Sequence, residues 1–521
     1  MCNIQSLVIN STAELPIMYV DVETTAMEHG QLQQRLWEIS QTEQLTVLPD
    51  AASLARARES LPRSLGDNGM GYDSVRRHIL EDIVPAFNSS SISPLYYGFV
   101  TGGITPAALF ADGIVSVYDQ NVQVHLTEHT IATDVEYTTL CLLADLLRLG
   151  CEWHNGTFTT GATASNILGL ACGREYVLRT ALARKGVTAI ESVGESGLFE
   201  TMQAAGLSGL QILSTMPHSS LAKAAGVLGF GRANVKDVSL ENDPLRFNLD
   251  LVESELRNSN KATIIAVSCG EVNTGQFATG GLNEMQQLRN LCDEYGAWLH
   301  VDGAFGIFAR TLPEDSEYSV VRKGCEGVEL ADSLAGDGHK MLNVPYDCGF
   351  FFCRHQNEAM SVFQNANAAY LTGGSTQAQS IPSPLNIGLE NSRRFRALPV
   401  YSSLIAYGSV GYQKMVQEHI RLARLIAGWL FDHPKYNALP DVKNKEGLLE
   451  KTYMVVLFSA KDNNLNSQLA ARIDETRKIF VSGTSWQGRP ACRIAISNWR
   501  VQAERDFAIV REVLDNVAGM E

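Results

Sequence analysis

Two residues of the chain could together bind and use an aldehyde cofactor. Lys340 follows His339 in the stretch 336–343, and it lies 38 positions after Asp302, which ends the apolar run 299–301. A lysine amine can form a Schiff base with an aldehyde, and a carboxylate can hold the protonated ring nitrogen of pyridoxal 5′-phosphate. The pair therefore predicts pyridoxal phosphate chemistry. An unrelated buried Asp and a surface Lys near apolar runs are the alternative.

A run of small residues before a predicted helix could bind the phosphate group of such a cofactor. Residues 159–166 read Thr-Thr-Gly-Ala-Thr-Ala-Ser-Asn and lead into a helix that we predict over 166–184. Small side chains let backbone N–H groups approach an anion, and the helix dipole favours negative charge at that end. Thr163 can add a hydroxyl. The alternative is an ordinary N-cap formed by Ser165 or Asn166.

Three positions, His218, Asp302 and Ala304, suit the ring of the cofactor. His218 opens another predicted helix in the stretch 217–225, where its imidazole could stack on a flat heteroaromatic ring or could simply cap the helix. Asp302 ends an apolar strand, where an unpaired carboxylate is costly and needs a cation. A pyridinium nitrogen is such a cation, and a structural salt bridge is the alternative. Ala304 is small enough to lie against a ring face.

Composition excludes several classes of protein. The 521 residues carry a formal charge of −15, which argues against nucleic acid and anionic membranes as general partners. No apolar stretch approaches the ~20 residues that span a bilayer, and no secretory signal is expected at the N-terminus. The ten cysteines form no Cys-x-x-Cys pair, which favours reduced thiols in the cytoplasm over disulfides or a metal site.

Hydrophobic periodicity predicts an α/β fold with a mostly parallel sheet. Residues 1–104 are expected to form a helical N-terminal segment that dimerises, 105–397 a large cofactor-binding domain, and 398–521 a small α+β domain. Strands that alternate with helices form parallel sheets, and such sheets bind ligands beyond the carboxyl ends of their strands. The predicted strands are 261–268, 298–301, 454–458 and 492–497, and the predicted helices include 31–44, 74–87, 137–149, 166–184, 284–295, 404–433, 465–477 and a last helix through Val513.

The order of phosphate loop, His218, Asp302 and Lys340 resembles that of a known family. The chain is similar to the group II pyridoxal phosphate-dependent amino acid decarboxylases of fold type I, which include aromatic amino acid, histidine and glutamate decarboxylases. The resemblance implies a large domain like that of aspartate aminotransferase. It covers about residues 75–515, and it is carried by the stretches 93–101, 161–166, 217–225, 300–304, 339–340, 344–349 and 392–398.

The resemblance also implies roles for individual residues. Thr101 matches a position that contacts the substrate carboxylate, Tyr370 matches a tyrosine that protonates the substrate carbon after CO₂ leaves, and Arg393 matches a residue that supports the active site. Glu271 and Val272 replace residues that carry hydroxyls in the family, which puts a cofactor contact there in doubt. The expected catalytic residues are Lys340, Tyr370, His218 and Asp302; the cofactor-binding residues are Ala162, Thr163, His218, Asp302, Ala304, Asp337, His339 and Lys340; the substrate-binding residues are Thr101, Phe99 and Arg393; no metal is expected.

The expected activity is decarboxylation of an L-amino acid to a primary amine and CO₂, by a homodimer with its active site at the subunit interface. Tyr96, Tyr97 and Phe99 favour a substrate with an apolar or aromatic side chain, unless these rings serve core packing. An aldehyde synthase and a retro-aldol C–C lyase on the same scaffold are alternatives. In the aldehyde-forming branch the loop tyrosine is replaced by Phe, so Tyr370 favours the amine. A catalytically silent binding protein is a further alternative.

Overall fold

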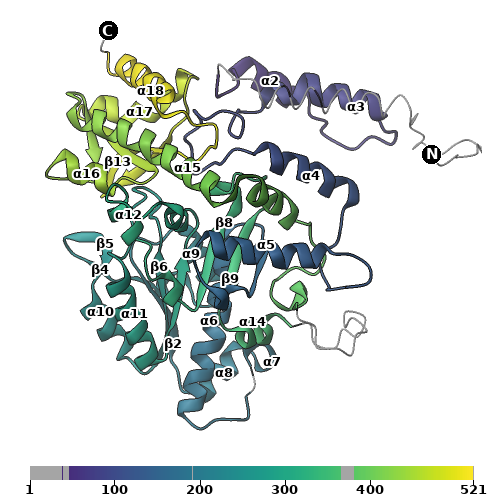
Figure 1. Ribbon diagram of the computed structural model, residues 1–521, viewed down its shortest axis with the longest axis vertical. Coiled ribbons are helices and arrows are strands. Elements are labelled where there is room, and N and C mark those ends of the chain that lie inside the picture. The colour runs from purple at the N-terminus through teal and green to yellow at the C-terminus, as the bar shows by residue number, and fades with distance from the viewer. Residues whose placement is uncertain (1–33, 35–37, 39–45, 191, 365–380, 520–521) are drawn as a thin grey trace, which may run out of the picture. The chain divides into compact units, whose positions relative to one another are not determined.

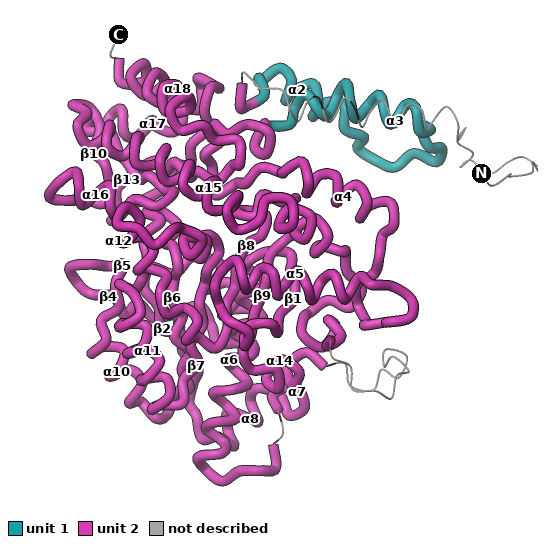
Figure 2. The backbone as a smooth tube through the Cα atoms, viewed as in Figure 1, with its two compact units in different colours: residues 1–45, 49–88 teal, residues 46–48, 89–521 magenta. Residues whose placement is uncertain are grey.

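The computed structural model describes residues 34, 38, 46–190, 192–364 and 381–519. The chain divides into two compact units, 1–45 with 49–88 and 46–48 with 89–521 (Figure 2). In the smaller unit, α2 (Ala51–Ser60) is capped by Asp50, and α3 (Tyr72–His78) continues into a π-helical turn and a 3₁₀ turn. The helix predicted over 74–87 is therefore only partly regular, because Pro85 cannot donate to an α-helical ladder. The helix predicted over 31–44 lies almost entirely outside the described residues.

A seven-stranded sheet runs through the larger unit in the order β1–β9–β8–β7–β6–β2–β3 (Figure 1). The two pairs that involve β9 are antiparallel and the other pairs are parallel, which confirms the predicted mostly parallel sheet. The strands are β1 (Gly156–Thr159), β2 (Gly209–Ser214), β3 (Val235–Asp237), β6 (Lys261–Ser268), β7 (Trp298–Asp302), β8 (Ser333–Asp337) and β9 (Gly349–Cys353).

Successive residues of the central strands point to opposite faces of this sheet. Ile264 of β6 packs into an apolar cluster with α6 (Ala162–Arg184), whereas Ile265 packs into a cluster that contains residues of α5 (Ala132–Leu146) and α15 (Ala397–Asp432). Both faces are therefore buried, which is why β6 and β7 read as continuous apolar runs in the sequence.

A second, antiparallel sheet follows in the order β10–β11–β13–β12. The strands and helices predicted after residue 398 correspond to its β11 and β13 and to the helices that accompany it, while the boundaries proposed at 104/105 and 397/398 stay predictions. The elements are β10 (Tyr436–Leu439), β11 (Val455–Ala460), β12 (Ser482–Trp486), β13 (Arg489–Ala495), α16 (Lys445–Lys451), α17 (Asn463–Glu475) and α18 (Ala503–Val517).

The predicted helices of the large domain are present, with shifted ends. The helix predicted over 137–149 is α5, which ends at Leu146 because Arg148 adopts a positive φ of 53°. Among the described residues, no helix is both long and apolar enough to cross a membrane. The remaining helices and strands are α4 (Pro106–Tyr118), α7 (Val193–Ser196), α8 (Leu198–Ala205), α10 (Leu249–Leu256), α11 (Leu282–Tyr295), α12 (Ser319–Lys323), α14 (Gln356–Phe363), β4 (Ser239–Leu240) and β5 (Asp243–Phe247).

Candidate active site

Most of the predicted site residues line one cavity of about 500 Å³, which we call the cofactor cavity. It lies at the carboxyl ends of the parallel strands: β1 leads into α6, β7 ends at Asp302, and β8 ends at Asp337. The predicted residues that line it are Phe99, Ala162, Thr163, His218, Asp302, Ala304, Asp337, His339 and Lys340.

The loop between β1 and α6 forms one end of the cofactor cavity. Its backbone lies against β9, where a Cβ added to Gly349 would come within 2.5 Å of Gly161 Cα, so only glycine allows this approach. Ala162, Thr163 and Ala164 then form the first turn of α6 and line the cavity. This turn presents a helix N-terminus to the cavity, which favours an anion.

Asp337 connects this turn to Lys340. The backbone N–H of Ala162 donates to Asp337 Oδ1 at 2.5 Å, and Lys340 Nζ lies 2.7 Å from Asp337 Oδ2. Lys340 is held there by α13 (Gly338–Met341), which follows β8 directly. The lysine amine therefore has a buried carboxylate beside it that can hold its proton.

Asp302 and His218 also line the cofactor cavity. Asp302 accepts hydrogen bonds from Asn166 Nδ2 at 2.9 Å and from the Ala304 N–H at 3.2 Å. His218 is the N-cap of α9 (Ser219–Val227), and burial lowers the pKa of its imidazole; nearby Asp302 opposes that shift, and Lys340 adds to it. His218 is thus uncharged at neutral pH, which suits a ring that stacks on an aromatic cofactor.

These residues fit pyridoxal phosphate. His339 Nδ1 is buried and has no hydrogen-bond partner among the described residues, although the ring lies close to the first turn of α6. Burial also lowers the pKa of His339, so the neutral ring can donate a hydrogen bond to a phosphate. The α6 N-terminus would bind the phosphate, and His218 and Ala304 would contact the ring. Asp302 would pair with the ring nitrogen, and Lys340 would bind the aldehyde carbon.

Two predicted residues that the structure describes, Thr101 and Arg393, do not line this cavity. Thr101 is buried beside it, where its hydroxyl donates to the Gly98 carbonyl at 3.0 Å and accepts from the Tyr346 hydroxyl at 3.4 Å. Tyr370 lies outside the described residues. Arg393 lies beside a different cavity, next to Glu136.

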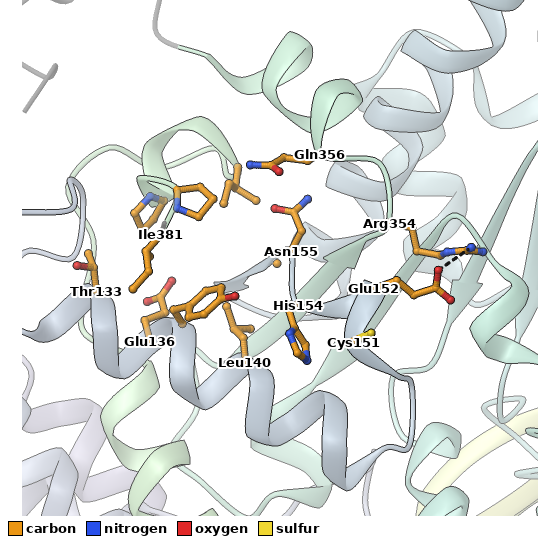
Figure 3. Close-up of a pocket in the computed structure, with 15 residues that line it drawn as sticks. Thr133, Glu136, Leu140, Cys151, Glu152, His154, Asn155, Arg354, Gln356 and Ile381 are labelled. Carbon is orange, nitrogen blue, oxygen red and sulfur yellow. Dashed lines mark hydrogen bonds and ion pairs between the residues drawn. The ribbon is translucent and has the colours of Figure 1, made fainter. Parts of the chain in front are cut away.

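Arg393 forms a buried ion pair with Glu136 of α5, and both side chains are at most 3% exposed. Glu136 lines a second cavity of about 370 Å³ at the edge of the sheet, together with Asn155 and the ion pair between Arg354 and Glu152 (Figure 3). Arg393 also donates to the carbonyl of Phe158 in edge strand β1 at 3.5 Å. The structure therefore places Arg393 as a support of the strand that leads into α6, outside the cofactor cavity.

The departure from the family pattern at Glu271 and Val272 has a structural explanation. The buried Glu271 carboxylate accepts four hydrogen bonds of 2.9–3.1 Å from Asn273 and Thr274, in its own loop. Val272 and Gly270 line the cofactor cavity instead. Positions 270 and 272 therefore offer no hydroxyl to a cofactor, although Ser268 at the end of β6 also lines the cavity.

Several lining residues were not predicted, and Arg493 is the most consequential of them. It lies on β13 of the small sheet and donates to the Phe99 carbonyl; burial lowers the pKa of its guanidinium to about 10, and Glu271 opposes that shift. In the sequence, Arg493 stands out as a single charged residue within the mostly apolar run 491–497, and that position indicates a functional role. Phe305 and Tyr346 also line the cavity, while Tyr97 packs in the core of the small domain.

Comparison with known proteins agrees with this geometry. The family model described as the pyridoxal-dependent decarboxylase conserved domain matches residues 57–443. An aromatic-L-amino-acid decarboxylase of Bacillus atrophaeus is 22% identical over 87% of this chain and 86% of its own length. A phenylacetaldehyde synthase of Arabidopsis thaliana is 24% identical over 84% of both proteins. An L-2,4-diaminobutyrate decarboxylase of Acinetobacter baumannii is 25% identical, but the match spans only about half of each protein, 53% and 51%.

A solved structure shows the same fold. Oryza sativa TDC, crystallised with PLP and tryptamine, superposes with a TM-score of 0.79 over 97% of this chain and 99% of its own, at 20% identity. This likeness confirms the predicted fold, and the family model together with the decarboxylase relatives confirms the cofactor and the enzyme class, a carboxy-lyase. Because the family model covers most of the chain and the residues that suit its cofactor meet in one cavity, the chain belongs to the pyridoxal-dependent decarboxylases.

Proposed function

We propose that this decarboxylase acts on an L-amino acid with an aromatic or apolar side chain and releases the primary amine and CO₂. The observation that carries the proposal is the cofactor cavity itself, which joins Lys340, Asp302 and His218 to a largely apolar wall. That wall contains Phe99, Val100, Val272, Phe305 and Tyr346. When bound, pyridoxal phosphate supplies the electron sink for the charge left on the substrate carbon after CO₂ departs.

The residues of the chain hold charge and protons in place for this reaction. Asp337, 2.7 Å from Lys340 Nζ, can keep the proton that the amine must lose before it reacts. Asp302 favours a protonated ring nitrogen, and the α6 N-terminus favours the phosphate. Because these groups are fixed before substrate arrives, little reorganisation is needed during the reaction.

An acidic substrate is the second candidate, and Arg493 is the observation that favours it. A guanidinium in the cofactor cavity could receive a side-chain carboxylate, and an aspartate 1-decarboxylase of Aliivibrio fischeri is 26% identical to this chain. However, Arg493 already donates to the Phe99 carbonyl, and the Glu271 carboxylate lies close enough to stabilise its charge. We therefore favour the aromatic or apolar substrate.

The nature of the product rests on Tyr370. Relatives of this chain include both decarboxylases and an aldehyde synthase. We propose the amine because the resemblance places Tyr370 at the position of the proton donor, which is Phe in the aldehyde-forming branch. The retro-aldol and silent-protein alternatives are less favoured, since Lys340, Asp302, His218 and Tyr370 are retained together.

A substrate panel tests the proposal. Purified protein saturated with pyridoxal phosphate is incubated with L-phenylalanine, L-tyrosine, L-tryptophan, L-aspartate and L-glutamate, and CO₂, amine, aldehyde and ammonia are measured. We expect CO₂ and amine in equal amounts from an aromatic substrate, and no turnover by Lys340→Ala. Lys323→Ala, which removes a lysine of α12 near a different cavity, is the matched control and should keep the wild-type rate. Preference for an acidic substrate, release of aldehyde, or an active Lys340→Ala variant would contradict the proposal.

We also propose that two copies pair in the cytoplasm, with the active site at their interface. Neighbouring helices α4 and α15 expose a group of large apolar side chains, including Phe110 and Tyr118, each 71% exposed, and Val117, 79% exposed. An exposed apolar surface of this kind is typical of a subunit interface. Light scattering of wild type and of Val117→Asp tests the pairing. The nine described cysteines are free thiols, which supports a reducing compartment.

A further inference from the structure

The Asp302 carboxylate lies at the end of a chain of hydrogen bonds that begins beneath the cofactor cavity. The Trp298 indole nitrogen lies 2.9 Å from Ser333 Oγ, which lies 2.8 Å from His300 Nδ1. His300 Nε2 lies 2.9 Å from Asn166 Oδ1, and Asn166 Nδ2 lies 2.9 Å from Asp302 Oδ2. The chain thus runs from β7 to β8, back to His300 of β7, on to α6, and then to the end of β7.

Only one direction of donation satisfies both ends of this chain. An indole N–H can only donate, so Ser333 accepts from Trp298, and an ionised carboxylate can only accept, so the Asn166 NH₂ group faces Asp302. The amide oxygen of Asn166 then faces His300, whose Nε2 must carry the hydrogen. His300 Nδ1 consequently accepts from the Ser333 hydroxyl. A reversed amide would set the Asn166 oxygen against the Asp302 carboxylate.

Burial supports this assignment. Trp298, Ser333, His300 and Asn166 are all fully buried, at 0% exposure. Burial lowers the pKa of His300 to about 4, although Asp302 opposes the shift, so the ring is neutral at physiological pH and has one donor and one acceptor. Gly169 of α6 makes room for the ring, since a Cβ there would come within 2.4 Å of His300 Cε1.

A branch of the chain reaches His218. Asn166 Nδ2 lies 3.3 Å from Ser220 Oγ, and Ser220 Oγ lies 2.8 Å from His218 Nδ1. The backbone N–H of Ser220 also donates to His218 Nδ1, at 3.2 Å. Because a backbone N–H can only donate, His218 Nδ1 is an acceptor, and His218 Nε2 carries the hydrogen.

We propose that Asn166, His300 and Ser333 are positioning residues of this enzyme: they fix the Asp302 carboxylate and, through Ser220, hold His218 in its Nε2–H tautomer. Their effect on the cofactor rests on the proposed function. The tautomers of His300 and His218, by contrast, are set by the protein and do not depend on a bound cofactor. Hydrogen bonds from groups behind a binding residue commonly set its tautomer and orientation in this way.

Nitrogen NMR of ¹⁵N-histidine-labelled protein without cofactor tests the tautomers. We expect His300 and His218 each to show an unprotonated Nδ1 and a protonated Nε2 at neutral pH. Ser333→Ala removes the donor to His300 Nδ1, so the His300 Nδ1 signal should shift, while Asn166 Oδ1 keeps the hydrogen on Nε2. Thr133→Val is the matched control, because it removes the hydroxyl that lies 2.6 Å from the buried His125 in another part of the fold. It should change the signals of His125 and leave those of His300 and His218 unchanged.

The affinity for pyridoxal phosphate is the second readout. Asn166→Leu and Ser333→Ala should weaken binding, by about tenfold for Asn166→Leu, and Thr133→Val should not. A charged His300 or His300 protonated at Nδ1 in the wild type would overturn the inference, as would unchanged His300 signals and affinity in Ser333→Ala. Because the NMR measurement needs neither cofactor nor substrate, its failure is distinguishable from a failure of the proposed decarboxylation.

Discussion

Replacing Arg393 by Met should destabilise the protein without removing a group from the cofactor cavity. The substitution leaves the Glu136 carboxylate buried without its cation, and both side chains are at most 3% exposed in the wild type. Loss of one partner from a buried ion pair costs about 3–5 kcal/mol, because the remaining charge stays desolvated. Glu136 Oε2 has no hydrogen-bond partner among the described residues, so little else compensates that charge.

The neighbouring arginine provides a matched control for this prediction. Arg394 also forms an ion pair, with Asp112, but these side chains are 37% and 27% exposed. Exposed pairs contribute only about 0–1 kcal/mol, so Arg394→Met should unfold almost like the wild type. The double variant Arg393→Met with Glu136→Leu removes both buried charges and should recover most of the lost stability.

Three measurements test the structural role of Arg393. They are urea unfolding followed by fluorescence, the affinity for pyridoxal phosphate, and the KM for the identified substrate. We expect a lower free energy of unfolding for Arg393→Met and a KM close to the wild-type value in the folded fraction. Wild-type stability combined with a large rise in KM would refute the structural role. Arg393 would then contact substrate, as the resemblance to the decarboxylases first implied.

The remaining predictions concern the catalytic step and acid stability. Asp302→Asn should lower kcat/KM by the equivalent of roughly several kcal/mol, and a rate within about twofold of wild type would make Asp302 a structural residue only. Tyr370→Phe should slow amine release and raise aldehyde, ammonia and peroxide, and an unchanged amine yield would remove Tyr370 from the mechanism. Burial lowers the pKa of both His300 and His419 to about 4. Between pH 6.5 and pH 4, only the unfolded chain therefore takes up protons at these two histidines. Their contribution to the free energy of unfolding is full above pH 6.5 and is lost as the pH drops toward 4. His419→Gln should reduce that loss by about 2 kcal/mol at pH 5 in urea unfolding, whereas identical pH profiles would show that His419 titrates normally.

The parts of the site that the sequence predicts well are those carried by local pattern. Asp302 ends strand β7 and Lys340 lies just after strand β8, while the small residues at the start of α6 lie where β1 leads into a helix. Because parallel strands share one carboxyl edge, these positions must converge once the sheet forms. The strand predicted over 261–268 matches β6 residue for residue, since both of its faces are buried.

The parts that the sequence does not predict depend on contacts between distant segments. Arg493 reaches the cofactor cavity from the second sheet, and its hydrogen bond to Phe99 joins positions 394 residues apart. Asn166 could be interpreted as a helix cap, yet its amide bridges His300 and Asp302. In each case the residue type was visible in the sequence, but its partner is set by the packing of whole elements.

The direction of the helix dipoles explains why the cofactor cavity is suited to an anion. A second hollow, at the amino ends of the parallel strands, differs from it in this respect. That hollow, about 530 Å³, is lined by cations that include Arg184 and Lys185. Arg184 donates to the carbonyls of Tyr295 and Glu294 at the end of α11, and Lys185 Nζ lies against Gly206, the C-cap of α8. These cations therefore offset the negative ends of helices. At the carboxyl edge of the sheet, by contrast, α6 and α9 present their N-termini to the cavity, and a helix N-terminus favours an anion such as a phosphate.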